Sequence, residues 1–257
     1  MDAIIGYTGL VGKNLLKQKK VDLLFNSKNI ADIVNYEIGI LYCCAPSAVK
    51  WKINKDPVSD LQNILQICNF LKNTKINKIV LISTIDVYDI KDSMNNEEDL
   101  NHNEIFDLSY GQNRKFFEKV IKSISSDYHI VRLPGLFGAG IKKNILYDLQ
   151  NDNMIENISL NTSYQWFNLD KLNNFINLAI EKNIKEINLF SEPVNTLEIV
   201  KNIFPSKLKL CTGQSKFKYN LTTKYAHFFK TKYNEEYIEN SDNILQQIEN
   251  YVRENKC

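Results

Sequence analysis

Short apolar runs alternate with stretches of helical periodicity along the first half of the chain. Apolar runs bounded by turn residues predict five strands, near residues 2–5, 21–25, 37–43, 77–84 and 127–133. Between them, apolar residues at helical spacing predict helices near 9–18, 28–34, 56–73 and 108–126. Strands that alternate with helices are typical of a parallel sheet with helices on both faces.

The pattern is less regular after residue 133. A polar stretch at 151–162 precedes a strand-like run at 164–169, a helix at 170–181 and a further strand at 186–190. The tail, at 242–254, has the pattern of an amphipathic helix that packs back onto the body. At 257 residues and 44% hydrophobic, the chain is long enough for one large α/β core with a small appended lobe.

Charge and hydropathy exclude several classes of protein. The 32 basic and 30 acidic residues are interspersed, so the clustered basic face of a nucleic-acid binder is missing. The longest apolar runs are strand-sized, far below the roughly 20 residues of a membrane helix. The first residues already form a strand and not a signal peptide. We therefore expect a cytoplasmic protein that binds neither nucleic acid nor membrane.

The cysteines predict neither disulfides nor a metal site. They form an odd set without metal-ligand spacing: Cys43, Cys44, Cys68, Cys211 and Cys257. Free thiols are expected for such a set in a reducing compartment.

Three glycines follow the first predicted strand at every third position, Gly6, Gly9 and Gly12. The first allows a tight turn, the second lets backbone approach a pyrophosphate, and the third lets the helix pack on the sheet. The predicted cofactor loop also contains Thr8, Leu10 and Val11, and the N–H groups of the last two would bind the pyrophosphate. A junction of strand and helix also uses glycine for packing alone, so this spacing leaves both interpretations open.

The residues after the second predicted strand bear on the choice of dinucleotide. An enzyme that uses NAD places Asp or Glu there to hold the ribose 2′-hydroxyl, whereas this chain has Asn26, Ser27 and Lys28. Ser27 and Lys28 suit a 2′-phosphate, which favours NADP(H) over NAD(H). In the alternative, Ser27 caps the next short helix and Lys28 is solvated.

Candidate catalytic residues follow the fourth strand. Thr84 ends this strand, and open parallel sheets place their active sites at the carboxyl ends of strands. Tyr110 begins a predicted helix, and Arg114 lies four residues later on the same helical face. The tyrosine and the arginine can therefore point the same way.

These motifs, with the segments 132–138 and 164–170, resemble the extended type of the short-chain dehydrogenase/reductase family, which contains nucleotide-sugar epimerases, dehydratases and ketoreductases. The resemblance implies an α/β fold with a Rossmann-type doubly wound parallel sheet and a small C-terminal α/β substrate lobe. The NAD(P)-binding core is predicted at 1–138, completed by about 164–190, and the lobe at 139–163 and 191–257. It also implies a homodimer formed through the helices 56–73 and 108–126.

The resemblance assigns roles to individual residues. Thr84 and Tyr110 match the family's catalytic pair, and Arg114 stands where the family has lysine. The implied cofactor contacts are the loop beside the adenine and pyrophosphate and one proline beside the nicotinamide: Cys44, Ala45, Pro46 and Pro134. The implied substrate contacts are Thr84, Asp86, Lys142, Lys143, Asn144 and Trp166. Each of these residues also has an alternative role. Asp86 would cap a loop, the two lysines would be solvated, and Trp166 would be a core residue.

Two departures from the family pattern affect the expected chemistry. A cation beside a tyrosine can lower its pKa by about 1–3, which Arg114 would do, but arginine cannot relay protons. Lys115 comes one residue late, about 100° round the helix, and is not expected to substitute. Ile85 occupies the position of the acid that protonates the leaving hydroxyl in the family's dehydratases, which argues against dehydration.

The sequence thus predicts an NADP(H)-dependent oxidoreductase that reduces a keto group, the 4-keto group of a nucleotide-linked sugar. Three alternatives remain: an epimerase acting on such a sugar, a cofactor-binding sensor or structural protein that has lost catalysis, and a reductase of lipid- or polyketide-like ketones.

Overall fold

The computed structural model of the chain describes residues 1–101, 107–229 and 235–255. The chain forms two compact units. The first comprises Met1–Asp89, Leu100–Arg132 and Asp170–Ile187, and the second Ile90–Asp99, Leu133–Leu169 and Asn188–Cys257. Residues 90–99, 133–138, 164–169 and 188–190 group with the second unit, whereas the boundaries expected from the sequence keep them with the first.

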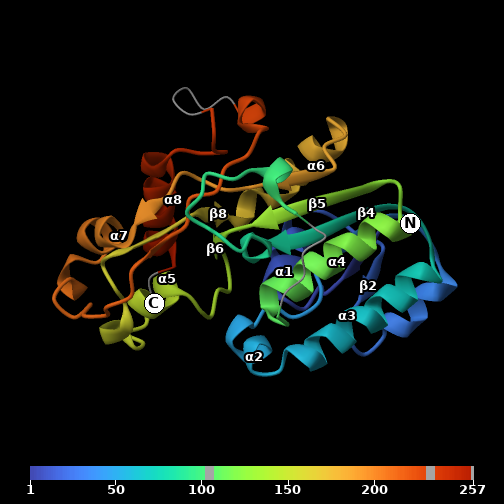
Figure 1. Cartoon of the computed structure of the whole chain (residues 1–257), viewed down its shortest axis with the longest axis horizontal. Helices are drawn as coiled ribbons and strands as arrows, with labels where there is room; N and C mark the ends of the chain where they lie inside the picture. Colours follow the sequence, from blue (N-terminus) through green and yellow to red (C-terminus); the bar gives the residue numbers. More distant parts are fainter. Residues whose placement is uncertain (102–106, 230–234, 256–257) are drawn as a thin grey trace. The chain divides into compact units, whose positions relative to one another are not determined.

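A six-stranded sheet forms the centre of the first unit, with the order β2-β1-β3-β4-β5-β9 (Figure 1). Its strands are β1 (Ala3–Ile5), β2 (Leu23–Phe25), β3 (Glu37–Cys43), β4 (Lys75–Thr84), β5 (Tyr128–Leu133) and β9 (Glu186–Asn188). β1 pairs in parallel with β2 and β3, and β3 pairs in parallel with β4. The predicted α/β fold with a parallel central sheet is confirmed.

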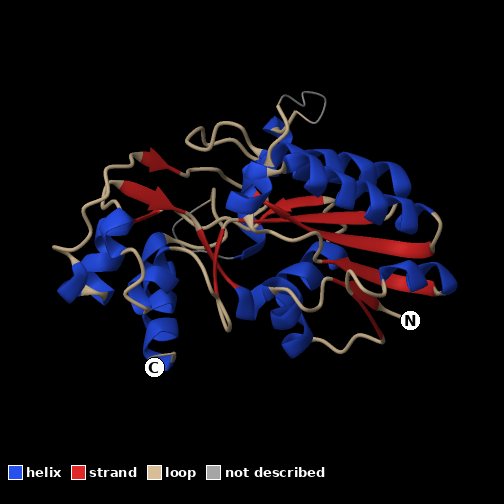
Figure 2. Cartoon of the chain, turned by 90° about the horizontal axis from the view of Figure 1, so that it is seen from below, coloured by secondary structure: helices blue, strands red, loops and turns tan. Residues whose placement is uncertain are grey.

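Helices cover both faces of this sheet, as Figure 2 shows. They are α1 (Leu10–Gln18), α2 (Lys50–Lys55), α3 (Pro57–Lys72), α4 (Tyr110–Ile124) and α6 (Leu172–Glu181). α3 packs against α4, and α1 contacts α6. The short helix predicted at 28–34 is a 3-10 helix, η1 (Ile30–Asn35), preceded by Asn29 as its cap residue. The alternative that made Ser27 the cap is therefore wrong.

The main core lies between the sheet and the pair α3 and α4. Apolar side chains of both helices pack on strand residues there: Ile64, Ile67, Leu71, Phe117, Ile121, Ile79 and Leu81. Burial of each such side chain contributes roughly 1.5–3 kcal/mol. This packing holds the first turn of α4 beside the carboxyl end of β4, where the two elements contact.

Within its described residues, the second unit has two small sheets and three α-helices. One sheet has the order β10-β7-β11, and in the other β6 pairs in parallel with β8. The strands are β6 (Gly135–Phe137), β7 (Thr162–Tyr164), β8 (Trp166–Asn168), β10 (Val194–Asn195) and β11 (Phe217–Lys218). The helices are α5 (Ile145–Gln150), α7 (Thr196–Ile203) and α8 (Ser241–Glu254). Single-turn 3-10 helices complete the two units: η2 (Ile85–Val87), η3 (Glu97–Asp99), η4 (Ile155–Asn157), η5 (Leu169–Lys171), η6 (Pro205–Lys207) and η7 (Ala226–Phe229).

The strand predicted at 164–169 is two short strands that belong to different sheets. Gln165 separates them, and its buried side chain donates to the carbonyls of Ser191 and Leu221. Its Oε1 accepts from the Leu221 N–H. These bonds draw Gln165 out of both strands and explain why one apolar run serves two sheets.

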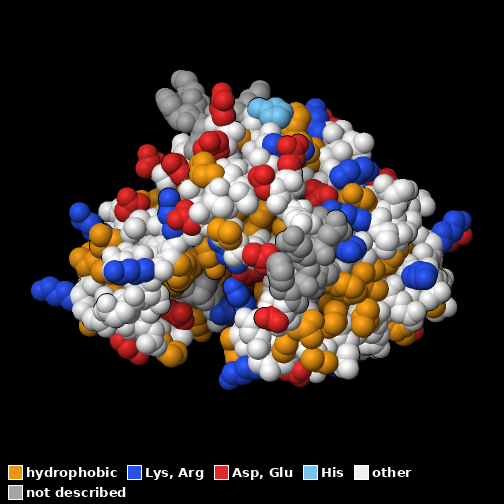
Figure 3. Space-filling view, in the orientation of Figure 1, with side chains coloured by type: hydrophobic (Ala, Val, Ile, Leu, Met, Phe, Trp, Pro, Cys, Tyr) orange, Lys and Arg blue, Asp and Glu red, His pale blue; other side chains and the backbone are white. Residues whose placement is uncertain are grey.

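Surface and cysteine chemistry complete the description. On the face drawn in Figure 3, basic and acidic side chains are interspersed. Within the described ranges, no helix is long and apolar enough to cross a membrane. Cys43, Cys44, Cys68 and Cys211 are free thiols, as predicted, and Cys257 lies outside the described residues.

Candidate functional site

The predicted cofactor loop has a shape that requires glycine. Gly6 has a φ of +83°, and a Cβ there would lie 2.8 Å from the Cys44 carbonyl oxygen. A Cβ on Gly12 would lie 2.3 Å from the Gly6 oxygen. Gly9 precedes α1 without a side-chain cap, so the N–H groups of the first turn have no side-chain acceptor from it. A close backbone turn before an uncapped helix start fits the pyrophosphate of a dinucleotide.

The residue after β2 is held by its neighbours. Asn26 donates its side-chain amide to the Tyr7 hydroxyl at 3.1 Å, and its Oδ1 accepts from the Lys28 N–H at 2.8 Å. The side chains of Ser27 and Lys28 are exposed. Asn26 therefore has its amide oxygen engaged, and the Tyr7 hydroxyl, which the sequence interpretation missed, lies beside it.

Thr84 and Tyr110 come together at the carboxyl end of β4. Burial raises the pKa of Tyr110, while the charge of Arg114 and a hydrogen bond with the Thr84 side chain lower it. The Thr84 hydroxyl also accepts from the Asp86 N–H at 3.2 Å. The predicted catalytic pair is therefore in hydrogen-bond contact, although the expected net lowering of the tyrosine pKa is outweighed by burial.

Three contacts fix the start of α4, which carries Tyr110. Ser109 caps the helix, its Oγ accepting from the Gln112 N–H at 3.3 Å. Asn54, at the end of α2, accepts from the Tyr110 N–H at 2.9 Å. A Cβ on Gly111 would lie only 2.0 Å from the Asp86 carbonyl oxygen, so the helix backbone is seated directly on η2.

Arg114 lies over the ring of Tyr110, with its Cζ 4.6 Å from the ring centroid. Its Nη1 donates to Asp60 Oδ2 at 2.8 Å, and its Nη2 donates to Asp60 Oδ1 at 3.1 Å and to the Ser47 carbonyl at 2.7 Å. Lys115 is also buried, but its Nζ lies 3.5 Å from Asp89 Oδ2. The arginine and the lysine thus serve different partners, as their offset on the helix predicts.

The sequence interpretation missed Asp60, although a signal was present. Asp60 is in register with the buried stripe of α3, four, seven and eleven residues before Ile64, Ile67 and Leu71. A carboxylate in a buried stripe needs a partner of opposite charge. The partner, Arg114, is 54 positions away and could not be identified from spacing.

A second buried ion pair supports the end of β4. Arg132, fully buried in β5, donates its Nη2 to Glu118 Oε2 at 2.8 Å and to Glu186 Oε2 at 2.5 Å. The Ser83 hydroxyl donates to Glu118 Oε1 at 2.5 Å. Because Ser83 precedes Thr84, these bonds tie the carboxyl end of β4 to α4 and β5.

The predicted substrate residue Asp86 is engaged within the first unit. Its Oδ1 lies 2.6 Å from Lys50 Nζ, and its carbonyl oxygen faces Gly111. Its carboxylate is 12% exposed. The charge of Asp86 is therefore balanced by Lys50, and its role toward a substrate stays a prediction.

Cys44, Ala45 and Pro46 follow β3 in the first unit, whereas Pro134 and the remaining predicted substrate residues lie in the second unit. Pro134 is buried between β5 and β6. Asn144 caps α5: its Oδ1 accepts from the N–H groups of Leu146 and Tyr147, and its amide donates to the Leu136 carbonyl at 2.7 Å. Lys142 and Lys143 are exposed. Trp166 is 1% exposed, and its indole N–H has no hydrogen-bond partner in the described part of the chain.

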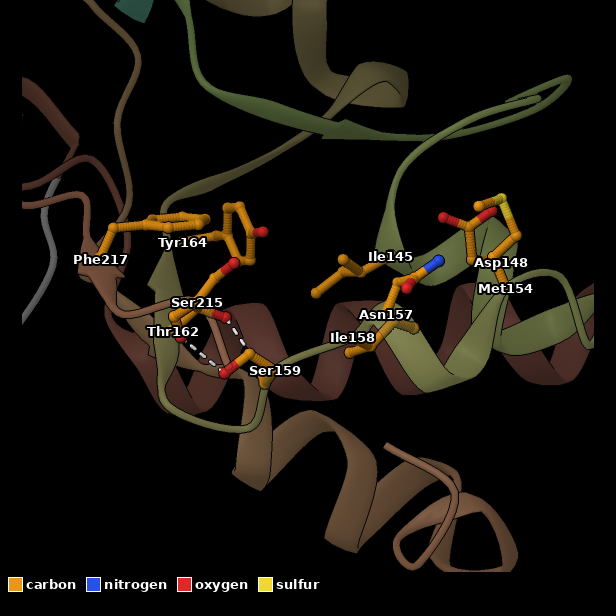
Figure 4. A pocket seen from close by; sticks show the side chains of 10 residues that line it. All are labelled: Ile145, Asp148, Met154, Asn157, Ile158, Ser159, Thr162, Tyr164, Ser215 and Phe217. Atoms are coloured by element: carbon orange, nitrogen blue, oxygen red, sulfur yellow. Dashed lines mark hydrogen bonds between the residues drawn. The ribbon is translucent and has the colours of Figure 1, made fainter. Parts of the chain in front are cut away.

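A pocket of about 260 Å³ opens within the second unit (Figure 4). Its lining mixes apolar, aromatic and polar side chains: Ile145, Asp148, Met154, Asn157, Ile158, Ser159, Thr162, Tyr164, Ser215 and Phe217. The rings of Tyr164 and Phe217 meet edge to face, with centroids 5.1 Å apart. Ile145, the residue after Asn144, lines the pocket, but neither Lys142 nor Lys143 does.

Comparison with known proteins relates this fold to nucleotide-sugar enzymes. No protein-family model and no curated protein matches the chain in sequence. Among solved structures, a dTDP-4-dehydrorhamnose reductase from Clostridium acetobutylicum is similar over 98% of this chain and 99% of its own, with a TM-score of 0.72 and 17% identity. A UDP-N-acetylglucosamine 4-epimerase from Methanobrevibacter ruminantium, in complex with UDP-N-acetylmuramic acid, is similar over 98% of each chain, with a TM-score of 0.70 and 15% identity.

A further dTDP-4-dehydrorhamnose reductase, from Bacillus anthracis in complex with NADP, is similar over 99% of this chain and 98% of its own. Its TM-score is 0.66 and its identity 17%. At these identities the likeness concerns the fold. The fold predicted from the resemblance to extended short-chain dehydrogenases/reductases is therefore confirmed as the fold of nucleotide-sugar reductases and epimerases.

Proposed function

We propose that this protein is an NADP(H)-dependent reductase of a keto group, the 4-keto group of a nucleotide-linked sugar. The observation that carries the proposal is the contact of Thr84 with Tyr110 beneath a held guanidinium at the carboxyl end of β4. In open α/β sheets this edge is where ligands bind, and the glycine cradle after β1 opens at the same edge. The proposed proton donor, Tyr110, and the proposed cofactor loop therefore lie at the same edge of one sheet.

Each catalytic residue has a distinct task in the reduction. The bound dinucleotide would supply the hydride to the carbonyl carbon. Tyr110 donates a proton to the carbonyl oxygen, and Thr84 hydrogen-bonds the same oxygen and orients it. Arg114 places a permanent positive charge against the Tyr110 ring, which favours the tyrosinate left after proton transfer.

Two features support NADP(H) over NAD(H). The position that holds a carboxylate in NAD enzymes is Asn26, whose amide oxygen is already engaged by Lys28. The exposed Ser27 and Lys28 side chains next to it suit a 2′-phosphate. Solved structures of this fold contain NADP in one case and NAD in another, so the preference rests on these two features of the chain.

The pocket of the second unit supports a polar substrate over a lipid-like ketone. Asp148 and Asn157 contribute polar side chains to its wall, whereas the hydroxyls of Ser159 and Thr162 bond to the Ser215 and Ser159 carbonyls. The rings of Tyr164 and Phe217 offer faces for a planar or cyclic group. Lys142, Lys143 and Trp166 remain predicted substrate contacts.

An epimerase is the second candidate, because a 4-epimerase shares the fold at nearly the same TM-score as the reductases. The two activities differ in the net change of the cofactor. A reductase consumes NADPH with each turnover, whereas an epimerase returns it unchanged. Loss of NADPH absorbance therefore separates the two.

The test is a turnover assay with NADPH and dTDP-linked and UDP-linked 4-keto-sugars, together with titrations of NADPH and NADH binding. We expect NADPH to bind more tightly than NADH and to be oxidised on addition of a keto-sugar. Tyr110→Phe should lower kcat by about 10²- to 10⁴-fold, the usual contribution of one acid-base group.

Tyr128→Phe is the matched control, because Tyr128 also faces a cation, Lys185, with 5.8 Å between Nζ and the ring centroid. This variant should keep full activity. Unchanged turnover in Tyr110→Phe contradicts the mechanism. Tight NADPH binding without oxidation by any keto-sugar contradicts the reductase and favours a protein that uses the cofactor as a structural or sensing ligand.

A further inference from the structure

Arginine is rare in this chain, and two of its positions are buried. Only three of the 32 basic residues are arginines: Arg114, Arg132 and Arg253. Arg114 and Arg132 are 5% and 0% exposed and face carboxylates, while Arg253 lies at the surface. A chain that uses lysine at nearly every basic position has arginine where a planar group must donate to several acceptors at once. Arg114 therefore has a geometric task in addition to its charge.

That task is visible in the partners of Arg114. Both oxygens of Asp60 accept from it, one from each terminal nitrogen, and the Ser47 carbonyl accepts from Nη2. Both hydrogens of Nη2 are thus engaged, in two directions within the guanidinium plane. A lysine ammonium on a flexible stem cannot reproduce this fork.

Asp60 is itself immobilised. It is 6% exposed and lies in the first turn of α3, where the helix dipole favours a negative charge. Asn113 donates to its Oδ2 at 2.9 Å and to the Pro57 carbonyl at 2.8 Å. Asp60 is therefore a fixed anchor that joins α3 to α4.

We propose that Asp60 is a positioning residue, which clamps the Arg114 guanidinium against the face of Tyr110 and keeps its charge there. The clamp makes Arg114 act on the tyrosine, in contrast to a mobile cationic arm. The other groups that face Tyr110 are Thr84 of β4, Asp86 of η2 and Lys50 of α2. Lys50 pairs with Asp86, whereas Arg114 lies against the ring itself, with its Cζ 4.6 Å from the ring centroid.

The test follows the guanidinium directly, since three arginines can be resolved one by one by mass spectrometry after labelling with an arginine-selective dicarbonyl reagent. In the unaltered protein Arg253 should react and Arg114 should be protected. Asp60→Asn should raise the labelling rate of Arg114 by about 10- to 100-fold, the effect expected when a charge-assisted hydrogen bond to a buried group is lost.

Asp56→Asn is the matched control, because Asp56 caps the same helix end by accepting from the Ser59 N–H at 3.1 Å but does not touch Arg114. This substitution removes a carboxylate charge from the same helix start while it keeps a capping oxygen, and it should leave Arg114 protected. Equal protection of Arg114 in Asp60→Asn and in the unaltered protein overturns the clamp.

The second readout is the ionisation of Tyr110, measured as the tyrosinate absorbance that disappears in the corresponding Tyr110→Phe variant. If Asp60 holds the cation in place, Asp60→Asn releases it and the pKa of Tyr110 rises by about 1. If Asp60 only neutralises a cation that stays, the pKa of Tyr110 falls. A fall, or no change, overturns the proposal.

Arg114→Lys keeps the charge and removes the fork, so it decides the question if Asp60→Asn does not fold. The clamp predicts that the pKa of Tyr110 rises in Arg114→Lys as well, although lysine is the residue expected from the family resemblance. An unchanged pKa in that variant overturns the proposal. The effect of the clamp on turnover rests on the proposed function, but both readouts work without substrate. If the unaltered protein is inactive and Asp60→Asn still releases Arg114, the result contradicts the reductase and not the clamp.

Discussion

Gly111→Ala tests how α4, which carries Tyr110, is seated. A Cβ at Gly111 would lie 2.0 Å from the carbonyl oxygen of Asp86 and 3.0 Å from its carbonyl carbon. Ordinary contacts of a Cβ begin near 3.4 Å, so α4 and η2 would have to separate by about 1.4 Å. Both partners are backbone, and neither can move aside as a side chain can.

Two effects of this substitution have opposite signs. Alanine in place of glycine in a helix stabilises it by up to about 1 kcal/mol. Overpacking of a well-packed contact destabilises by about 1–3 kcal/mol, and a backbone clash of this size belongs to the upper part of that range. We expect a net loss of about 1–2 kcal/mol in the free energy of unfolding, which lowers Tm by about 2–8 °C in a chain of this size.

The assay is thermal unfolding followed by circular dichroism, with Gly39→Ala as the control. A Cβ on Gly39 would meet the side-chain Oδ1 of Asp2 at 3.1 Å, and this oxygen, which accepts from the Ile40 N–H at 3.0 Å, would have to shift by only about 0.3 Å. Gly39→Ala should therefore change Tm much less. Because the clash also displaces Tyr110 by about 1 Å, turnover should fall by about 10²-fold in Gly111→Ala. An unchanged or raised Tm would show that α4 does not rest on the Asp86 carbonyl, and the reasoning fails.

Two further predictions concern buried carboxylates, one in each unit. Glu118→Gln removes one partner of the buried Arg132 and should lower the free energy of unfolding by about 3 kcal/mol, since a second carboxylate, Glu186, remains beside the arginine. The control is Glu249→Gln, in an exposed helical pair with Arg253, which should lower it by less than about 0.5 kcal/mol. Equal Tm values for the two variants would contradict this. Burial raises the pKa of Glu97 above its ordinary value of 4.5, so the folded chain takes up this proton before the unfolded chain as the pH falls. As the pH falls from the raised pKa toward 4.5, the unfolding free energy of the unaltered protein should therefore increase relative to that of Glu97→Gln. A difference between the two proteins that is independent of pH would contradict the assignment.

Local patterns were reliable where one element buries one face. The helix expected at 56–73 is α3 (Pro57–Lys72), and the tail helix expected at 242–254 is α8 (Ser241–Glu254). Prediction failed at short strands, because two or three residues carry no usable period. The run expected as one strand at 164–169 is two short strands of different sheets, separated at Gln165, and α7 was not predicted at all.

The candidate site shows the same division. The cradle of Gly6 and Gly12 and the spacing of Tyr110 and Arg114 are local features, so the sequence alone determined them. A turn needs its glycines in place, and residues four apart share a helical face whatever surrounds the helix.

The tertiary structure decided which groups those residues meet. Arg114 donates to Asp60, which lies 54 positions away in the sequence, and the pocket of the second unit is lined by residues of 145–164 together with Ser215 and Phe217. Such contacts depend on how whole elements pack, and no spacing along the chain encodes them. The physical reason is that periodicity reports which face of an element is buried, whereas the partner on the other side is chosen only when the packed elements bring their polar groups within hydrogen-bond distance.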